Sequence, residues 1–140
     1  MIRLFDLSLQ LNGFPIKKAK AELDKIVCFS EEEFASFLEN KKKEIVDFHL
    51  KNNSFYAALV GDKTFKNWED LPILNKQNLQ KPLQERLSKG YSKKNIYLNK
   101  TSGSSGTPLI FAKDKYSHAL TWASNIMRFG WFGIDFNHSY

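Results

Sequence analysis

Residues 101–108, Thr-Ser-Gly-Ser-Ser-Gly-Thr-Pro, combine hydroxyl groups and glycines in a way that suits the binding of an anion. Five of these residues carry a hydroxyl group: Thr101, Ser102, Ser104, Ser105 and Thr107. Gly103 and Gly106 permit positive φ and a close approach of the backbone to a ligand. Successive N–H groups in such a turn can converge on an anion, and hydroxyl groups add donors. The segment therefore predicts a loop that binds nucleotide phosphates, although Gly/Ser tracts are also typical of linkers.

Two short strand-like runs flank this loop and favour a ligand-binding turn over a linker. Residues 95–99 alternate Ile96 and Leu98 with Tyr97 and Asn99, and residues 109–112 read Leu-Ile-Phe-Ala. Two strands that pair through the loop would hold it at both ends, whereas a linker joins independent units. The loop lacks the Gly-Lys-Ser/Thr ending of a Walker A loop, and it does not match the Gly-x-Gly-x-x-Gly dinucleotide pattern.

The chain before the loop is predicted to be mostly helical. Apolar spacing places Leu4, Leu7 and Leu11 on one face of a helix that ends at Asn12-Gly13. Pro15 suits the first turn of a second helix, and its core stripe is predicted to be Ile16, Ala19, Leu23 and Ile26. A short apolar helix is expected over residues 54–60, and further short helices are expected to begin at Asn75 and Pro82.

The longest helix of this part is predicted to begin at a capping box and to end at Asn52-Asn53. Ser30 and Glu33 have the spacing at which each side chain can bond the other's backbone amide. The apolar side chains expected to be buried are Phe34, Phe37, Leu38, Ile45 and Phe48. Lys41 to Lys43 and Glu44 are expected to face water.

Behind the loop, Asp114 is predicted to cap a long amphipathic helix. Its core stripe is expected to be Tyr116, Ala119, Leu120, Ala123, Ile126, Met127 and Trp131. Large apolar residues continue almost to Tyr140, with few residues left to cover them, so we expect the front part of a longer domain.

The fold class predicted from these elements is α/β, rich in helix. Residues 1–140 are interpreted as one incomplete domain. Residues 1–94 are expected to be mainly helical, and residues 95–140 are expected to form a strand, the phosphate loop, a second strand and a helix.

The charge and composition exclude several classes of function. The formal net charge is +6, and it comes almost wholly from lysine, since only Arg3, Arg86 and Arg128 are arginine. Interfaces with nucleic acid rely on arginine for bidentate contacts, so no nucleic-acid partner is predicted. The run Lys41–Lys43 lies among acidic residues and is typical of a solvated helix face.

Neither a metal site nor a membrane span is predicted. The three histidines are far apart in the sequence and no cysteine or carboxylate cluster accompanies them. Cys28 is the single cysteine and is interpreted as a buried or half-buried structural thiol. Asp6 interrupts the apolar N-terminal stretch, and no apolar run approaches the ~20 residues of a membrane span. We therefore expect a cytoplasmic protein.

Three segments resemble the adenylate-forming enzymes, and within them the phenylacetate–CoA ligase-like branch, which includes relatives associated with capsular polysaccharide biosynthesis. Thr101 to Pro108 match the phosphate loop of that branch, Thr/Ser-Ser-Gly-Ser/Thr-Ser/Thr-Gly-x-Pro, at every position. Residues 70–76, Asp-Leu-Pro-Ile-Leu-Asn-Lys, resemble its Leu-Pro-x-x-x-Lys segment, and residues 53–56 resemble its Asn-x-Phe/Tyr-Tyr turn. Many members of the wider superfamily carry Lys after the proline, where this chain has Leu109, as the branch allows.

The resemblance implies an ATP-dependent ligase that works in two steps. A carboxylate attacks the α-phosphate of ATP and releases pyrophosphate, and the acyl-adenylate then passes to a thiol, usually that of coenzyme A. Residues Thr101 to Thr107 would hold the β- and γ-phosphates of ATP, and Mg²⁺ would neutralise the phosphate oxygens. Lys76 is either a second cation near the phosphates or a surface lysine.

The resemblance also implies that much of the active site lies beyond residue 140. The family's adenine-binding segment, Mg²⁺ carboxylate, ribose-binding Asp, hinge and catalytic Lys all follow the loop. We therefore expect no catalytic residue and no metal ligand in this chain, no turnover on its own and at best millimolar affinity for ATP. The expected partners are ATP, a carboxylic acid and the remainder of the ligase chain.

Two other interpretations stay open. The first is a relative that keeps the loop but transfers acyl groups during the biosynthesis of a capsular or surface polysaccharide. The second is a non-enzymatic helical interaction module with an ordered Gly/Ser turn.

Overall fold

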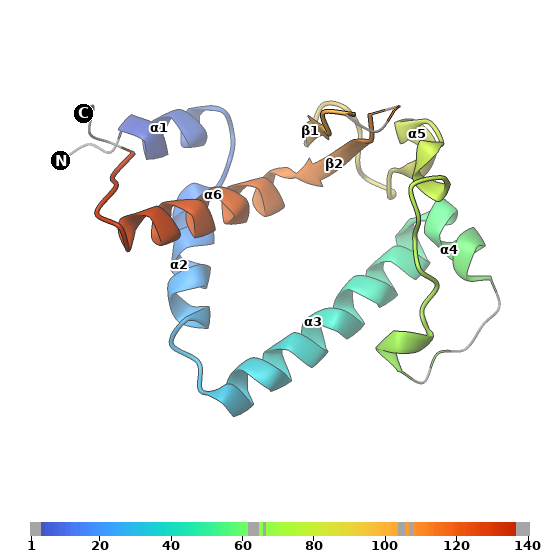
Figure 1. Ribbon diagram of the computed structural model, residues 1–140, viewed down its shortest axis with the longest axis horizontal. Coiled ribbons are helices and arrows are strands. Elements are labelled where there is room, and N and C mark those ends of the chain that lie inside the picture. The colour runs from blue at the N-terminus through green and yellow to red at the C-terminus, as the bar shows by residue number, and fades with distance from the viewer. Residues whose placement is uncertain (1–3, 62–64, 66, 104–105, 107, 137–140) are drawn as a thin grey trace. The chain divides into compact units, whose positions relative to one another are not determined.

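The computed structural model describes residues 4–61, 65, 67–103, 106 and 108–136, and it shows a mixed α/β chain rich in helix (Figure 1). The chain forms two units. One unit comprises Met1–Ser30 and Lys113–Tyr140, and the other comprises Glu31–Ala112. We call them the terminal unit and the central unit.

The terminal unit is built from three helices: α1 (Leu4–Leu11), α2 (Ile16–Ile26) and α6 (Lys115–Gly130). Helix α2 crosses α6 and packs against it, and α1 packs against α2 (Figure 1). The buried core of this unit consists of Leu9, Ile16, Ala19, Ala119 and Ala123. The alanines on α2 and α6 allow the two helices to approach closely, because interaxial distance depends on the side chains at the contact.

The sequence correctly predicted how α6 begins. Asp114 adopts extended backbone angles, and its carboxylate accepts a hydrogen bond of 2.6 Å from the amide of Ser117. A carboxylate at this position satisfies an amide that has no partner within the helix and also interacts favourably with the helix dipole. The predicted stripe is confirmed at Ala119 and Ala123, but Trp131 at its end is exposed.

The predicted core face of α1 is wrong. Leu4, Leu7 and Leu11 are exposed, and Leu9 is buried instead. Phe5 and Leu9, one helical turn apart, form the inward face of α1. The Phe5 ring meets the Trp122 ring edge-on with 5.0 Å between their centroids. This aromatic contact favours the rotation of the helix that is observed, since edge-to-face pairs add to the gain from burial alone.

The central unit begins with α3 (Glu31–Asn52) and α4 (Ser54–Val60), which pack against each other at a sharp corner. Two 3₁₀ turns follow, η1 (Trp68–Asp70) and η2 (Asn78–Gln80), and then the short helix α5 (Leu83–Arg86), which packs against α4. The strands β1 (Ile96–Lys100) and β2 (Ile110–Asp114) form a two-stranded antiparallel sheet, and β2 leads directly into α6.

The burial predicted for α3 is wrong. Helix α3 has the predicted start and end, but none of its residues is buried. Phe34, Leu38, Ile45 and Phe48 are between 38% and 46% exposed. Apolar spacing indicates which side of a helix is apolar, but not whether this chain supplies the surface that covers it.

Candidate functional site

The predicted phosphate loop lies between β1 and β2, as the flanking sequence indicated. The backbone amide of Thr101 donates to the carbonyl of Leu109 at 3.0 Å, and the amide of Leu109 donates to Thr101 Oγ1, also at 3.0 Å. These two bonds join the ends of the loop immediately beyond the paired strands. The loop is therefore a hairpin connection held at its base, which is the arrangement expected of a ligand loop rather than of a linker.

Steric constraints explain why residue 103 is a glycine. Gly103 has φ of +71°, and a Cβ atom there would lie 2.8 Å from the carbonyl oxygen of Gly106 and 2.8 Å from Cγ of Pro108. Both the left-handed backbone and the available space therefore exclude larger side chains. Gly106 also has positive φ, +118°, and its amide donates to the carbonyl of Gly103 at 2.9 Å. These contacts place Gly103 close to Gly106 and Pro108.

The hydrogen bonds within the loop determine which of its donors remain for a ligand. The amides of Thr101 and Gly106 are already used within the loop. Thr101 Oγ1 accepts from Leu109, so its own proton is still available for donation. Ser102 is exposed and has no hydrogen-bond partner among the described residues. The groups available to an anion here are thus the hydroxyls of Thr101 and Ser102 and the amides of Ser102 and Gly103.

Three predicted site residues, Ser104, Ser105 and Thr107, lie outside the described residues. Their assignment to the phosphate site remains a prediction.

Arg86 fastens the second strand of the hairpin to the helical part of the central unit. Its Nη2 donates to the carbonyl of Ile110 at 2.7 Å, and its Nε donates to the carbonyl of Lys81 at 2.8 Å. A guanidinium group suits this role because its donors have a fixed planar geometry. Sequence reasoning missed Arg86, since no local pattern indicates a contact between residues 24 positions apart.

Asn53 forms hydrogen bonds with the same segment around α5. Its side-chain oxygen accepts from the amide of Tyr56 at 2.9 Å and caps α4, while its Nδ2 donates to the carbonyl of Arg86 at 2.9 Å and to Ser88 Oγ at 3.0 Å. Asn53 is buried, and these bonds satisfy its amide. The Asn-Ser-Phe-Tyr turn found in the sequence therefore supports the chain from which Arg86 reaches β2.

His49 completes this polar cluster. Its Nδ1 lies 3.4 Å from Ser88 Oγ, and its ring lies beside that of Tyr56 with 5.8 Å between centroids. Burial lowers the pKa of His49 below its usual 6.5. The neutral imidazole is thus favoured in the folded protein, and the cluster is a structural support for the hairpin rather than a charged site.

Lys76 lies in an exposed turn. The turn is closed by two reciprocal bonds, in which the amides of Asn75 and Asn78 each donate to the other's side-chain oxygen at 3.0 Å and 2.9 Å. Asn75 was predicted to cap a helix containing Lys76, but the 3₁₀ turn η2 begins only at Asn78. Among the described residues, no hydrogen bond or ion pair joins Lys76 to the loop, so its role at the phosphates remains a prediction.

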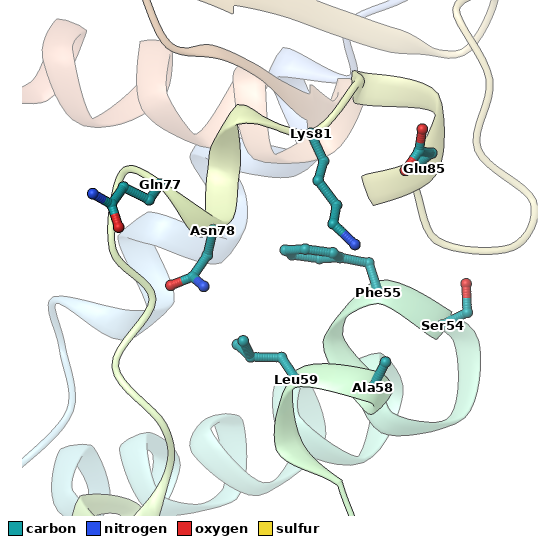
Figure 2. Close-up of a pocket in the computed structure, with 8 residues that line it drawn as sticks. All are labelled: Ser54, Phe55, Ala58, Leu59, Gln77, Asn78, Lys81 and Glu85. Carbon is teal, nitrogen blue, oxygen red and sulfur yellow. The ribbon is translucent and has the colours of Figure 1, made fainter.

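A groove of about 670 Å³ lies between α4 and the segment that contains η2 and α5 (Figure 2). Phe55, Ala58 and Leu59 give it an apolar surface, and Lys81 and Glu85 give it charged groups. The ammonium group of Lys81 lies 5.7 Å from the centroid of the Phe55 ring, and Figure 2 shows the lysine side chain reaching toward that ring. Such a groove has the size of a small-molecule site.

Sequence reasoning missed this groove. Its lining residues come from two segments separated by more than fifteen positions, and no motif marks them. Gln77 and Asn78 contribute to the lining, whereas their neighbour Lys76 does not.

Cys28 is exposed, so the prediction of a buried or half-buried thiol is wrong.

The described part of the chain contains no group of three or more His, Cys, Asp or Glu side chains that could hold a metal ion. None of its helices is long and apolar enough to cross a membrane.

Comparison with known proteins identifies no relative of this chain. No family model matches the chain, and no curated protein and no solved structure match it.

Proposed function

We propose that residues 101–108 bind the β- and γ-phosphates of ATP, and that this chain is the N-terminal part of an adenylate-forming acid–thiol ligase. The fold proposed for it is the first part of the large domain of these enzymes. The observation that supports the proposal is the hairpin connection, in which Gly103 has positive φ and the hydroxyl protons of Thr101 and Ser102 have no acceptor among the described residues.

The chemistry requires little more from this segment than positioning and charge stabilisation. When a carboxylate attacks the α-phosphate of ATP, negative charge develops on the departing pyrophosphate. Amide and hydroxyl donors held in place before the reaction stabilise that charge without reorganising. Residues 101–103 supply such donors, and the hydrogen bonds at the base of the loop keep them in position.

The remaining components of the reaction are proposed to come from outside this chain. Mg²⁺ bound with ATP would neutralise phosphate oxygens, and coenzyme A would accept the acyl group. The described residues contain no cluster of metal ligands, so we assign no residue of this chain to Mg²⁺. Lys76 is proposed as a further cation near the phosphates.

The test is a titration of the ¹⁵N-labelled chain with MgATP, inorganic tripolyphosphate and adenosine. We expect weak binding of the first two, in the millimolar range, with the largest amide shifts at Ser102 and Gly103. Adenosine alone should not shift these amides. Shifts centred on the α4–α5 groove instead, or no response to tripolyphosphate, would contradict the proposal.

A matched pair of serine variants sharpens the test. Ser102→Ala removes one hydroxyl donor from the loop and should weaken the binding of tripolyphosphate several-fold, since one such bond contributes about 1 kcal/mol. Ser36→Ala lies on the surface of α3 and should leave the binding unchanged.

A further inference from the structure

The positive charge of this chain is concentrated in one part of the sequence. Residues 71–112 contain seven lysine or arginine side chains and a single acidic side chain, that of Glu85. The rest of the chain contains fourteen basic and fourteen acidic side chains. The net charge of +6 is therefore carried by residues 71–112, which all belong to the central unit. A local excess of one sign of charge attracts ligands of the opposite sign.

A groove of about 510 Å³ in the central unit is lined mainly by residues from this basic segment. Two of the lining residues are lysines, Lys89 and Lys93, and none of the described residues that line the groove is acidic. The other lining residues are Asn52, Ser54, Gln84, Leu87, Ser88, Gly90, Tyr91 and Ser92. We call this space the lysine groove. It differs from the α4–α5 groove, which contains both Lys81 and Glu85.

The turn that carries the two lysines is held in place by hydrogen bonds. The amide of Lys89 donates to the carbonyl of Asn52, the last residue of α3, at 2.7 Å. The side chain of Asn95 closes the rest of the turn: its Nδ2 donates to the carbonyl of Gly90 at 2.8 Å, and its Oδ1 accepts from the amide of Ser92 at 2.7 Å. Because these contacts fix the backbone, a ligand would not have to order it on binding.

Several donors on residues that line the lysine groove have no partner among the described residues. The ammonium groups of Lys89 and Lys93 form no ion pair there. The backbone amides of Gly90 and Lys93 likewise donate to no described residue. Ser92 Oγ accepts from the amide of Lys94 at 3.4 Å and keeps its own proton for donation. Ammonium, amide and hydroxyl donors together suit a phosphoryl group, which lysine binds as a point charge.

We propose that the lysine groove binds the phosphoryl group of a small organic phosphomonoester, at a place separate from the loop of residues 101–108. A phosphomonoester carries a charge of about −1.5 to −2 at pH 7, which matches the two ammonium groups, whereas a carboxylate supplies only one negative charge. Leu87 and Tyr91 line the same groove and offer apolar surface to the rest of the ligand. The proposal does not depend on the binding of ATP by the loop.

The test is a titration of the ¹⁵N-labelled chain with glucose 6-phosphate, glucuronate and glucose, which are similar in size but differ in charge. We expect glucose 6-phosphate to shift the amides of Gly90, Ser92 and Lys93 with a dissociation constant of about 1 mM or below. Glucuronate should bind much more weakly, and glucose should not bind. Inorganic phosphate is a fourth probe. Weaker binding of inorganic phosphate than of glucose 6-phosphate supports an organic phosphomonoester, whereas tighter binding would overturn that part of the proposal.

The same spectra separate the lysine groove from the loop. Shifts by glucose 6-phosphate that are confined to Ser102 and Gly103, or equal binding of glucose 6-phosphate and glucuronate, would overturn the proposal. A loop that fails to respond to tripolyphosphate would contradict the ATP site but would not change the expected shifts at Gly90, Ser92 and Lys93.

Two neighbouring lysines supply a matched pair of variants. Lys93→Gln removes an ammonium group from the lysine groove and should weaken the binding of glucose 6-phosphate about tenfold. Lys94→Gln makes the same change of charge one residue further along, but Lys94 does not line the groove. At an ionic strength of about 0.15 M its effect should stay below about twofold, because salt screens a charge that does not contact the ligand. Both side chains are exposed, so neither change should lower the melting temperature. Equal effects of the two variants would show unspecific attraction to the basic segment and would overturn the proposal.

Discussion

The guanidinium group of Arg86 joins the carbonyl of Ile110, on the strand that follows the glycine loop, to the carbonyl of Lys81, at the edge of the α4–α5 groove. The loop is thus not supported by strand pairing alone. Its second strand is also held by a side chain from the helical segment, and that segment is in turn held by Asn53.

We expect Arg86→Gln to loosen the hairpin. The shorter amide side chain cannot reach both carbonyls, and the loss should lower the free energy of unfolding by about 1 kcal/mol. It should also weaken the binding of tripolyphosphate by the loop. Urea denaturation and the phosphate titration measure the two effects. Arg128→Gln is the control, because the only hydrogen bond of the exposed Arg128 side chain to another described residue goes to the nearby Asn125. Equal effects of the two variants would contradict this role of Arg86.

Gly103→Ala should disturb the loop more than alanine at two other glycines. At Gly103 the added Cβ meets both backbone strain and close atoms, whereas at Gly61, with φ of +64°, it meets strain in open space. Gly130 ends α6 without positive φ and with open space around it. We expect Gly130→Ala to be neutral or slightly stabilising and Gly61→Ala to cost about 1 kcal/mol. Gly103→Ala should cost more than Gly61→Ala and should also reduce phosphate binding. Thermal denaturation of the three variants measures the order of their stabilities.

Asn53→Ala should be among the most destabilising polar substitutions in the central unit. It removes the cap of α4 and leaves the carbonyl of Arg86 and the hydroxyl of Ser88 without their buried donor. The expected cost is about 2 kcal/mol. Asn52→Ala is a close control, because within the described part of the chain the Asn52 side chain makes a single, exposed hydrogen bond, to the carbonyl of Phe48. Chemical denaturation of the two variants should differ by more than 1 kcal/mol, about the value of one such bond.

Stability should fall as the pH is lowered from about 7.5 to about 5. Burial lowers the pKa of His49, and burial together with the charge of Lys113 lowers that of His118. Both pKa values lie below the usual 6.5 in the folded protein, so the unfolded chain takes up protons first. Their contribution is complete above pH 6.5 and is lost as the pH falls through 6.5 toward the folded values.

Denaturation of the His49→Gln and His118→Gln variants at several pH values tests whether these two histidines cause the pH dependence of stability. Each variant should show a smaller loss of stability between about pH 7.5 and about pH 5 than the parent chain. A pH dependence that is the same in all three proteins would contradict the assignment.

Local signals predicted the elements of this fold well. Asp114 was correctly predicted to cap α6, and the alternation on both sides of residues 101–108 correctly predicted a hairpin. These features depend on residues within a few positions of each other. The glycines of the loop were also found from the sequence, because positive φ is a local requirement that few other residues meet.

Features that depend on distant partners were not predicted. The periodicity of α3 identified Phe34 and Ile45 as one apolar face but could not show that the central unit leaves this face exposed. His118 is buried beside Phe14, with 4.6 Å between the ring centroids, and no pattern in the sequence marked that pair. Arg86 and Lys81 likewise acquire their positions only when segments far apart in the chain come together.

The two units are connected by two stretches of the polypeptide, and this decides which fragments keep a unit intact. The polypeptide passes from one unit to the other twice, between Ser30 and Glu31 and between Ala112 and Lys113. The central unit is therefore an insertion within the other, carried on one continuous stretch of sequence. A cut after Ala112 would fall inside β2, so a fragment of the central unit that keeps the whole hairpin has to extend to Asp114. Removing α1 and α2 would take from α6 the helix that packs against it.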